Sequence, residues 1–353
     1  MSSPAVADTD LVRACRRQPV SRTPVWFMRQ AGRSLPEYRS ARGEGSILSA
    51  IGDAALAAEL TLQPVRRYGV DAAILFSDIV VPVHAVGFGV DVEPGRGPVV
   101  AEPFRSDRDL ARLRPLEPET DVPYVAEAVR LVSRELAGSG VALIGFAGAP
   151  FTVASYLVEG GPSRTFAKVK TLMHADPDLW CRLMARLADM AVASLRAQIQ
   201  AGAQAVQLFD SWAGSLSPKE YARFVLPATR AVFDGIADLG VPSILFGVGT
   251  GELLRLMGTT GCHVVGIDWR VPLQEARLRI GPGLGVQGNL DPALCAAPWP
   301  VVERAARAVL ASGAADASGT GHIFNLGHGV PPQADIGILG ALVDLVHAES
   351  TGA

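Results

Sequence analysis

Two arginines, Arg29 and Arg33, flank the short turn Gln30-Ala31-Gly32 at the end of an apolar run, and Arg42 follows nine residues later. An arginine side chain presents a planar fork of N–H donors that matches the two oxygens of a carboxylate. The glycine allows backbone N–H groups to approach a ligand closely. This combination predicts a cradle for a ligand that carries several carboxylates. The same residues also fit a helix start with solvated arginines, and only three of the 32 basic residues are lysine, so arginine content alone decides little.

Three further side chains follow apolar segments at positions where they could serve chemistry. Asp78 ends an almost wholly apolar run, where a carboxylate could bind cationic or N–H-rich groups or simply cap a turn. His328 has glycines on both sides, which would let its imidazole approach a ligand. Tyr156 belongs to a run rich in small residues that could form the floor for a flat ligand, although core packing would explain the aromatic residues of that run equally well.

Short apolar runs alternate with longer amphipathic ones from about residue 70 onward. Alternating strands and helices predict a parallel sheet that is covered by helices. Seven runs fit strands, at 71–76, 141–146, 205–210, 243–248, 263–268, 285–289 and 322–326. Helical spacing with proline and glycine punctuation predicts helices at 121–137, 177–201, 218–239 and 301–311.

The predicted fold is α/β, a single-domain (β/α)8 TIM barrel over residues 1–353 with its core at about 11–347. Val25–Met28 or another early segment would supply the eighth strand, and a doubly wound open sheet is the alternative. Unusual residues follow the predicted strands, among them Asp78, Ser211 and His328. Chemistry gathered at the C-terminal rim is typical of the barrel.

Composition argues against several classes of protein. A net charge of −3 and a pI near 6.1 give no nucleic-acid footprint. The most apolar stretch, residues 70–90, is interrupted by polar residues and proline, so we expect no membrane span. The first ten residues lack a signal pattern, which favours a cytoplasmic protein. Scattered cysteines predict no metal site, and the GxGxxG match at 283–288 opens in a predicted strand, so no cofactor is expected.

Several segments together resemble the uroporphyrinogen decarboxylase family, and the resemblance runs from about residue 11 to residue 347. The family's N-terminal signature, P-x-W-x-M-R-Q-A-G-R, is reproduced by residues 24–33. A second signature, G-F-x-x-x-P-[FYW]-T-x-x-x-Y, is met by residues 145–156. Residues 76–78, 287–292 and 325–329 are also similar to family segments. Five matches in the right order make the resemblance specific.

The resemblance implies an enzyme that removes CO2 from the four acetate side chains of uroporphyrinogen and that forms a homodimer. It implies that Arg29 and Arg33, with the backbone of residues 30–32, hold substrate carboxylates, and that Arg42 adds a further basic contact. It also implies that Asp78 faces the pyrrole N–H groups, so that Asp78 and Arg29 are the catalytic candidates. Tyr156, Ser211 and His328 would contact the substrate's side chains.

Two other functions fit the same sequence. A corrinoid-linked methyltransferase is similar to the decarboxylases, but its chemistry activates a thiol on zinc through His and Cys ligands, and the chain has no H-x-C pair. A tetrapyrrole-binding protein without turnover would keep the arginines but would not need Asp78. The identity of the proton donor, the order of the four decarboxylations and the isomer preference stay open.

Overall fold

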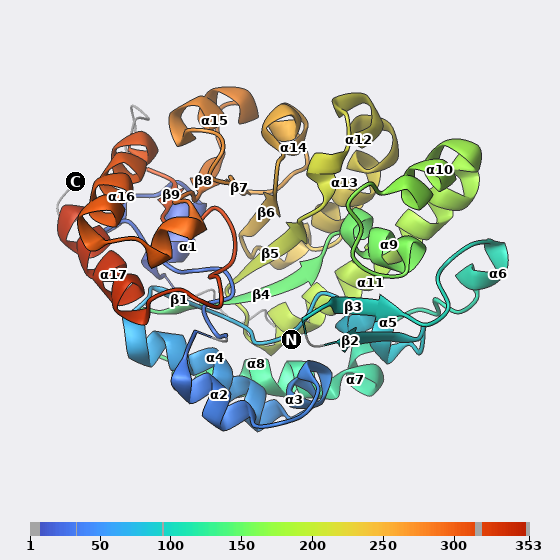
Figure 1. The fold of residues 1–353 in the computed structure, drawn as a ribbon, viewed down its shortest axis with the longest axis horizontal. Helices are drawn as coiled ribbons and strands as arrows, with labels where there is room; N and C mark the ends of the chain where they lie inside the picture. The colour runs from blue at the N-terminus through green and yellow to red at the C-terminus, as the bar shows by residue number, and fades with distance from the viewer. Residues whose placement is uncertain (1–7, 33, 94, 315–319, 351–353) are drawn as a thin grey trace.

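A seven-stranded parallel sheet lies at the centre of the computed structural model, which describes residues 8–32, 34–93, 95–314 and 320–350 (Figure 1). Its strands are neighbours in chain order: β1 (Ala72–Ile74), β4 (Ala142–Gly148), β5 (Ala205–Asp210), β6 (Ser243–Gly247), β7 (Val264–Gly266), β8 (Gly285–Gln287) and β9 (His322–Ile323). This order contradicts the doubly wound alternative, in which the strand order reverses. The predicted alternation of strand and helix is confirmed. An antiparallel hairpin of β2 (Val90–Glu93) and β3 (Gly97–Val100) stands apart from the sheet.

Helices surround the outside of the curled sheet in Figure 1. They are α1 (Asp10–Cys15), α2 (Pro36–Arg42), α3 (Ile47–Gly52), α4 (Ala54–Tyr68), α5 (Val81–Ala85), α6 (Asp107–Leu110), α7 (Pro118–Asp121), α8 (Pro123–Glu135), α9 (Pro150–Glu159), α10 (Ala167–Ala175), α11 (Pro177–Ala201), α12 (Pro218–Phe224), α13 (Leu226–Asp234), α14 (Leu254–Met257), α15 (Leu273–Ile280), α16 (Trp299–Gly313) and α17 (Ile336–Ser350). The helix predicted at 177–201 is α11.

The helix predicted at 218–239 is divided between α12 and α13, with Val225 in a non-helical conformation between them. Pro227 explains the break, because proline has no N–H to donate and its ring clashes with the carbonyl four residues earlier. Proline is tolerated in the first turn of a helix, so a new helix begins at Leu226. The amphipathic spacing therefore predicted helix correctly and missed the interruption.

The eighth strand predicted at 25–28 is not a strand in this structure. Val25 forms an isolated parallel bridge with Phe324, directly after β9. The carbonyl of Val25 accepts the N–H of Asp71, just before β1, at 2.8 Å. The ladder goes no further at Met28, because the N–H of Met28 donates to the side chain of Asn325 instead, at 3.1 Å. The segment thus lies between the two edges of the sheet while making few strand hydrogen bonds.

A buried chain of polar side chains crosses the inside of the curled sheet. The indole N–H of Trp26 donates to Gln287 on β8 at 3.0 Å, and the amide of Gln287 donates to Gln207 on β5 at 2.9 Å. All three side chains are at most 1 % exposed. Hydrogen bonds in such a low-dielectric interior are strong, so this chain ties the early segment to two strands that lie far apart in the sheet.

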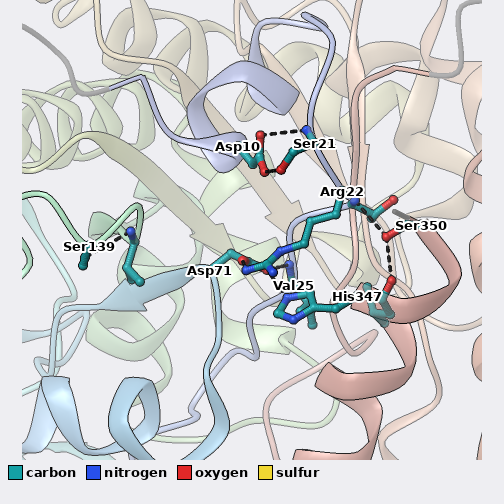
Figure 2. Close-up of polar contacts among 11 residues, drawn as sticks. Asp10, Ser21, Arg22, Val25, Asp71, Ser139, His347 and Ser350 are labelled. Carbon is teal, nitrogen blue, oxygen red and sulfur yellow. Dashed lines mark hydrogen bonds and ion pairs between the residues drawn. The ribbon is translucent and has the colours of Figure 1, made fainter. Parts of the chain in front are cut away.

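A second polar cluster, drawn in Figure 2, joins the early segment, β1 and α17 through Asp71. The carboxylate of Asp71 accepts the N–H of Val25 and a guanidinium N–H of Arg22, each at 2.8 Å, and lies 2.8 Å from Nε2 of His347. Burial alone would raise the pKa of Asp71, but these three donors outweigh it and hold the pKa below its usual range. The last helix is therefore fastened to the start of the sheet.

Candidate functional site

The loop that carries Arg29 is held in an unusual conformation by residues far away in the chain. Arg29 has φ = +58°, in the left-handed region that residues with a side chain rarely adopt. The carbonyl of Met28 accepts the N–H of Val330 at 2.8 Å, while its N–H is bound to Asn325. Strain of this kind persists only where the surroundings over-determine it. The exposed side chain of Arg29 is therefore carried by a rigid loop.

Gln30 supports this loop from below. Its side chain is fully buried, with Oε1 accepting the N–H of Phe27 at 3.0 Å and the amide donating to the carbonyl of Ala72 at 3.0 Å. Ala31 and Gly32 are half-buried at the outer side of the turn. Arg33 lies outside the described residues.

Asp78 lies in the loop after β1 and is half-buried. One carboxylate oxygen accepts the N–H of Val80 at 3.0 Å. Burial raises the pKa of Asp78, and the N–H of Val80 and the charge of Arg29 oppose that rise. The carboxyl is thus poorly solvated and is held by backbone N–H groups near the charge of Arg29, an arrangement that can stabilise positive charge developing on a ligand.

The imidazole of His328 is oriented by its own loop. Its Nδ1 accepts the N–H of Gly329 at 2.6 Å, so in the neutral ring the proton sits on Nε2. Burial lowers the pKa of His328 to about 4, with help from the charges of Arg29 and Arg270 and against the charge of Asp268. The ring packs edge-on against Phe246, with centroids 6.4 Å apart. At neutral pH His328 is therefore an uncharged hydrogen-bond donor.

An aromatic wall is built from Tyr156 on α9, Trp212 after β5 and Phe166. The ring of Trp212 lies 4.5 Å from that of Tyr156 and 4.8 Å from that of Phe166, centroid to centroid. Burial raises the pKa of Tyr156 to about 12, and the charge of Asp78 adds to the effect, so the phenol stays protonated. Ser211 is half-buried directly before Trp212. The rings of Tyr156 and Phe166 are inclined to that of Trp212 by 52° and 83°, so the wall is an angular apolar surface that carries the Tyr156 hydroxyl.

The structure brings four of the sequence-predicted site residues into one electrostatic neighbourhood. The charge of Arg29 acts on Asp78, on Tyr156 and on His328, and the charge of Asp78 acts on Tyr156. All four follow, or lie beside, the carboxyl ends of sheet strands. Their elements are separated by up to 299 positions in the chain, so only the fold makes them neighbours.

Arg42 belongs to a separate hollow at the end of α2. Together with Tyr38, Arg39 and Pro332 it lines a cavity of about 430 Å³. Its guanidinium donates to the carbonyl of Gly45 at 2.6 Å, while its Nε is buried without a partner among the described residues. A cavity edged by two arginines suits an anionic group.

Two charged groups at the rim, Asp210 and Arg270, are not among the predicted site residues. Asp210 is 1 % exposed at the end of β5 and accepts the hydroxyl of Thr152 at 2.8 Å, and burial raises its pKa to about 7. Arg270 is paired with the buried Asp268 after β7. Both stand at predicted strand ends, which was the available signal, but neither lies in a motif.

Among the described residues no group of three or more His, Cys, Asp and Glu side chains is arranged to hold a metal ion. None of the helices given above combines the length and continuous apolarity that crossing a bilayer requires.

The amino-acid sequence matches a known protein family over nearly its whole length. The family model for uroporphyrinogen decarboxylase matches residues 7–349. This chain belongs to the uroporphyrinogen decarboxylase family. The uroporphyrinogen decarboxylase of Streptomyces griseus is 59% identical over 346 residues, which cover 98% of this chain and 93% of the relative. That of Salinispora tropica is 59% identical over 341 residues, covering 97% and 90%. The resemblance found in the sequence motifs is confirmed.

Solved structures with lower identity share the fold. A methyltransferase from Methanosarcina mazei superposes with a TM-score of 0.77 at 20% identity, covering 96% of this chain and 98% of its own. A B12-independent methionine synthase from Shewanella sp. W3-18-1 superposes with a TM-score of 0.56 at 14% identity, covering 86% and 89%. At these identities the likeness concerns the fold alone.

Proposed function

We propose that this chain removes CO2 from the four acetate side chains of uroporphyrinogen III and so forms coproporphyrinogen III. Family membership makes it a carboxy-lyase of tetrapyrrole biosynthesis. The observation that carries the proposal is the convergence of Arg29, Asp78, Tyr156 and His328 at one rim of the sheet. The family motifs assign contacts with the substrate to these four residues.

The arginines hold the carboxylates of the substrate. Arg29 is presented on a rigid loop, and Arg33 follows it in the same signature. The backbone of Ala31 and Gly32 completes the cradle, and the buried side chain of Gln30 fixes it from beneath. Arg42 contributes at the neighbouring hollow. Charge-assisted pairs with carboxylates are the strongest contacts that such a ligand can make.

Asp78 faces the ring nitrogens of the substrate. Loss of CO2 leaves an electron pair that needs an acceptor, and a pyrrole ring that has taken up a proton can serve as one. Each round therefore releases one CO2 and takes up one proton. The carboxylate of Asp78, desolvated before the substrate arrives, stabilises the cationic ring by an electrostatic contact that needs no reorganisation. Arg29 places the acetate that reacts, since a guanidinium is a poor proton donor.

Tyr156, Ser211 and His328 bind the side chains on the remaining side of the ring. The neutral Nε2–H of His328 donates to a carboxylate, and so does the protonated phenol of Tyr156. Ser211 offers its hydroxyl at the edge of the wall formed with Trp212.

We also propose that the chain is one domain whose sheet closes as a (β/α)8 barrel, with the segment at 25–28 taking the place of the eighth strand through the bridge at Val25 and not as a regular strand. Support comes from the backbone hydrogen bonds of this segment to both sheet edges and from the bond between Trp26 and Gln287. A homodimer that shelters the rim from water is the second part of this proposal, since a twofold dimer is the commonest oligomer. Light scattering at micromolar concentration should give twice the 37.0 kDa mass of the chain. A monomer mass with full activity would contradict the dimer alone.

The decisive experiment is anaerobic incubation with uroporphyrinogen III, followed by chromatography of the porphyrins after oxidation. Dialysed protein with a chelator present should convert the substrate to coproporphyrinogen through intermediates that have lost one, two and three carboxylates. A protein that binds the substrate and releases no CO2 would be a tetrapyrrole-binding protein, and the proposal would fail.

A further inference from the structure

An arginine outside the family motifs stands at the same rim as the site residues. Arg270 follows β7 and comes two residues after Asp268. The residues assigned to the substrate's side chains all come from other parts of the chain: the early loop, α2, α9 and the segments after β5 and β9. Arg270 would add a cation from a strand that otherwise contributes nothing to the proposed site.

The guanidinium of Arg270 is pinned on two sides. Its Nη1 donates to the carboxylate of Asp268, which is 2 % exposed and also accepts the backbone N–H groups of Gly249 and Arg270. Its central carbon lies 4.0 Å above the ring centroid of Trp269, within the range of a cation–π contact. The side chain has therefore given up much of its rotamer freedom before any ligand arrives, so little is lost on binding.

One edge of this guanidinium remains available. Within the described residues, Nη2 and Nε make no hydrogen bond, and the side chain is 51% exposed. Asp268 is satisfied from several directions and is buried behind the guanidinium. A guanidinium can donate to one carboxylate on each edge, so the contact with Asp268 leaves donors for a second anion on the solvent side.

The loop that carries Arg270 packs against the loop that carries His328, and the charge of Arg270 acts on the imidazole. Gly327 packs against the backbone of Trp269 so tightly that a Cβ there would lie 2.4 Å from the Trp269 nitrogen. Asn289 fixes the same loop from beneath, because its amide donates to the carbonyls of Asp268 and Val271 at 2.8 and 2.6 Å. The loop of Arg270 and the loop of His328 therefore form one rigid stretch of the rim.

We propose that Arg270 binds a side-chain carboxylate of the tetrapyrrole next to His328 and so contributes to substrate affinity. The inference rests on the proposed function, because that function supplies the carboxylates. The contact is to an acetate that is later lost or to a propionate that survives all four rounds. Arg270 touches no reacting atom in this assignment, so it governs binding rather than the rate of the chemical step.

Steady-state kinetics of Arg270→Met should show KM for uroporphyrinogen raised roughly 2- to 10-fold, the scale of a half-exposed ion pair, with kcat within about twofold of wild type. The KM of Arg270→Lys should lie between those of wild type and Arg270→Met, since an ammonium keeps the charge but cannot form two parallel hydrogen bonds to a carboxylate. The matched control is Arg130→Met on α8, because Arg130 is equally exposed at 50% and is likewise paired with one carboxylate. Its KM should not change.

A structural role for Arg270 predicts a different result in a double variant. Arg270→Met alone leaves the buried Asp268 without its cation, so Asp268→Asn is added to remove that charge. A KM that stays raised in the double variant supports the substrate contact, whereas a KM restored to the wild-type value overturns it. Circular dichroism and thermal melting test whether each variant is folded. If a methionine variant does not fold, Arg270→Lys replaces it in the same measurements.

Fluorescence titration with uroporphyrin and coproporphyrin, the oxidised rings that do not react, identifies the carboxylate. Equal losses of affinity for both rings in Arg270→Met assign a propionate, and a loss confined to uroporphyrin assigns an acetate. Unchanged affinity for both overturns the inference. A wild-type protein that forms no coproporphyrinogen would refute the proposed function instead, so the two failures are distinguishable.

Discussion

Replacing Gly329 by alanine should displace the side chain of Arg29 while leaving the arginine itself unmutated. A Cβ on Gly329 would lie 2.6 Å from Cδ and 2.8 Å from Cγ of Arg29, whereas ordinary contact begins at 3.4 Å. The arginine must therefore retreat by about 0.8 Å, the difference between 3.4 and 2.6 Å. Gly329 does not have a positive φ, so alanine adds no backbone strain there. The backbone N–H that orients His328 is also kept.

A displacement of this size matters because Arg29 is proposed to place the reacting acetate. Misplacing a reacting group by about 1 Å can cost on the order of 10²-fold in rate. Since part of the retreat can be absorbed by the flexible stem of Arg29, we expect kcat/KM to fall roughly 10- to 100-fold, which corresponds to about 1.4–2.7 kcal/mol. Stability should change little, because the crowded atoms belong to a side chain that can move.

The assay is anaerobic steady-state turnover of uroporphyrinogen by Gly329→Ala, Arg29→Ala and the control Gly340→Ala. Gly340 lies in α17, where an added Cβ meets nothing within 4 Å, so the control should keep wild-type kinetics. Wild-type kcat/KM in Gly329→Ala, beside a severe loss in Arg29→Ala, would refute the claim that this contact sets the position of Arg29. Unchanged kinetics in both would remove Arg29 from the site.

Asp78→Asn should lower kcat by roughly 10²–10³ with the fold intact, the usual scale for losing one electrostatic contact to a transition state; near-normal turnover would reduce Asp78 to a turn cap. Burial raises the pKa of Asp210 from 3.8 to about 7, so wild-type stability should fall as the pH rises from about 4 to 7, because the carboxyl then ionises in the unfolded chain but stays protonated in the folded one. Asp210→Asn should be more stable than wild type at pH 8 but not at pH 4.5. The same difference in urea-unfolding free energy between variant and wild type at the two pH values would contradict this. Asp71→Asn should lose about 2–3 kcal/mol of unfolding free energy at pH 7, the scale of hydrogen bonds to a charged group. The difference should shrink only as the pH falls below 3.8 and through the lowered pKa of Asp71, where the wild-type carboxyl becomes protonated too. Equal midpoints at pH 7 would show that the cluster is not stabilising.

Much of the architecture could be predicted because its signals are local. The bounds of α11 follow from its caps: the side chain of Asp176, before Pro177, accepts the N–H of Leu179 at 3.0 Å, and the backbone N–H of Gly202 donates to the last turn. The seven parallel strands are fully or almost fully buried runs, and burial on both faces leaves a continuous apolar pattern in the sequence. The family motifs pointed to Arg29, Asp78, Tyr156 and His328 because each motif is contiguous.

The sequence could not show how those residues would be held, since their supports come from distant parts of the chain. Arg29 owes its left-handed backbone to a loop in which Met28 is bound by Asn325, 297 positions away. The neutral state of His328 depends on burial and on two arginines from separate loops. Nothing in its neighbouring residues indicates either effect.

The same reason explains what the sequence left out or misjudged. Residues 25–28 have the composition of a strand, yet Asn325 takes the N–H that a ladder would need. In the sequence Arg270 has the appearance of a solvated surface charge. In the structure it is fixed by Asp268 and Trp269, and its charge acts on His328. Residue type and spacing determined the elements and the chemistry that the chain could offer, because propensity and capping act over a few residues. Tertiary structure alone decided which donors meet which carboxylates and which groups lose their water, because both depend on contacts between residues hundreds of positions apart.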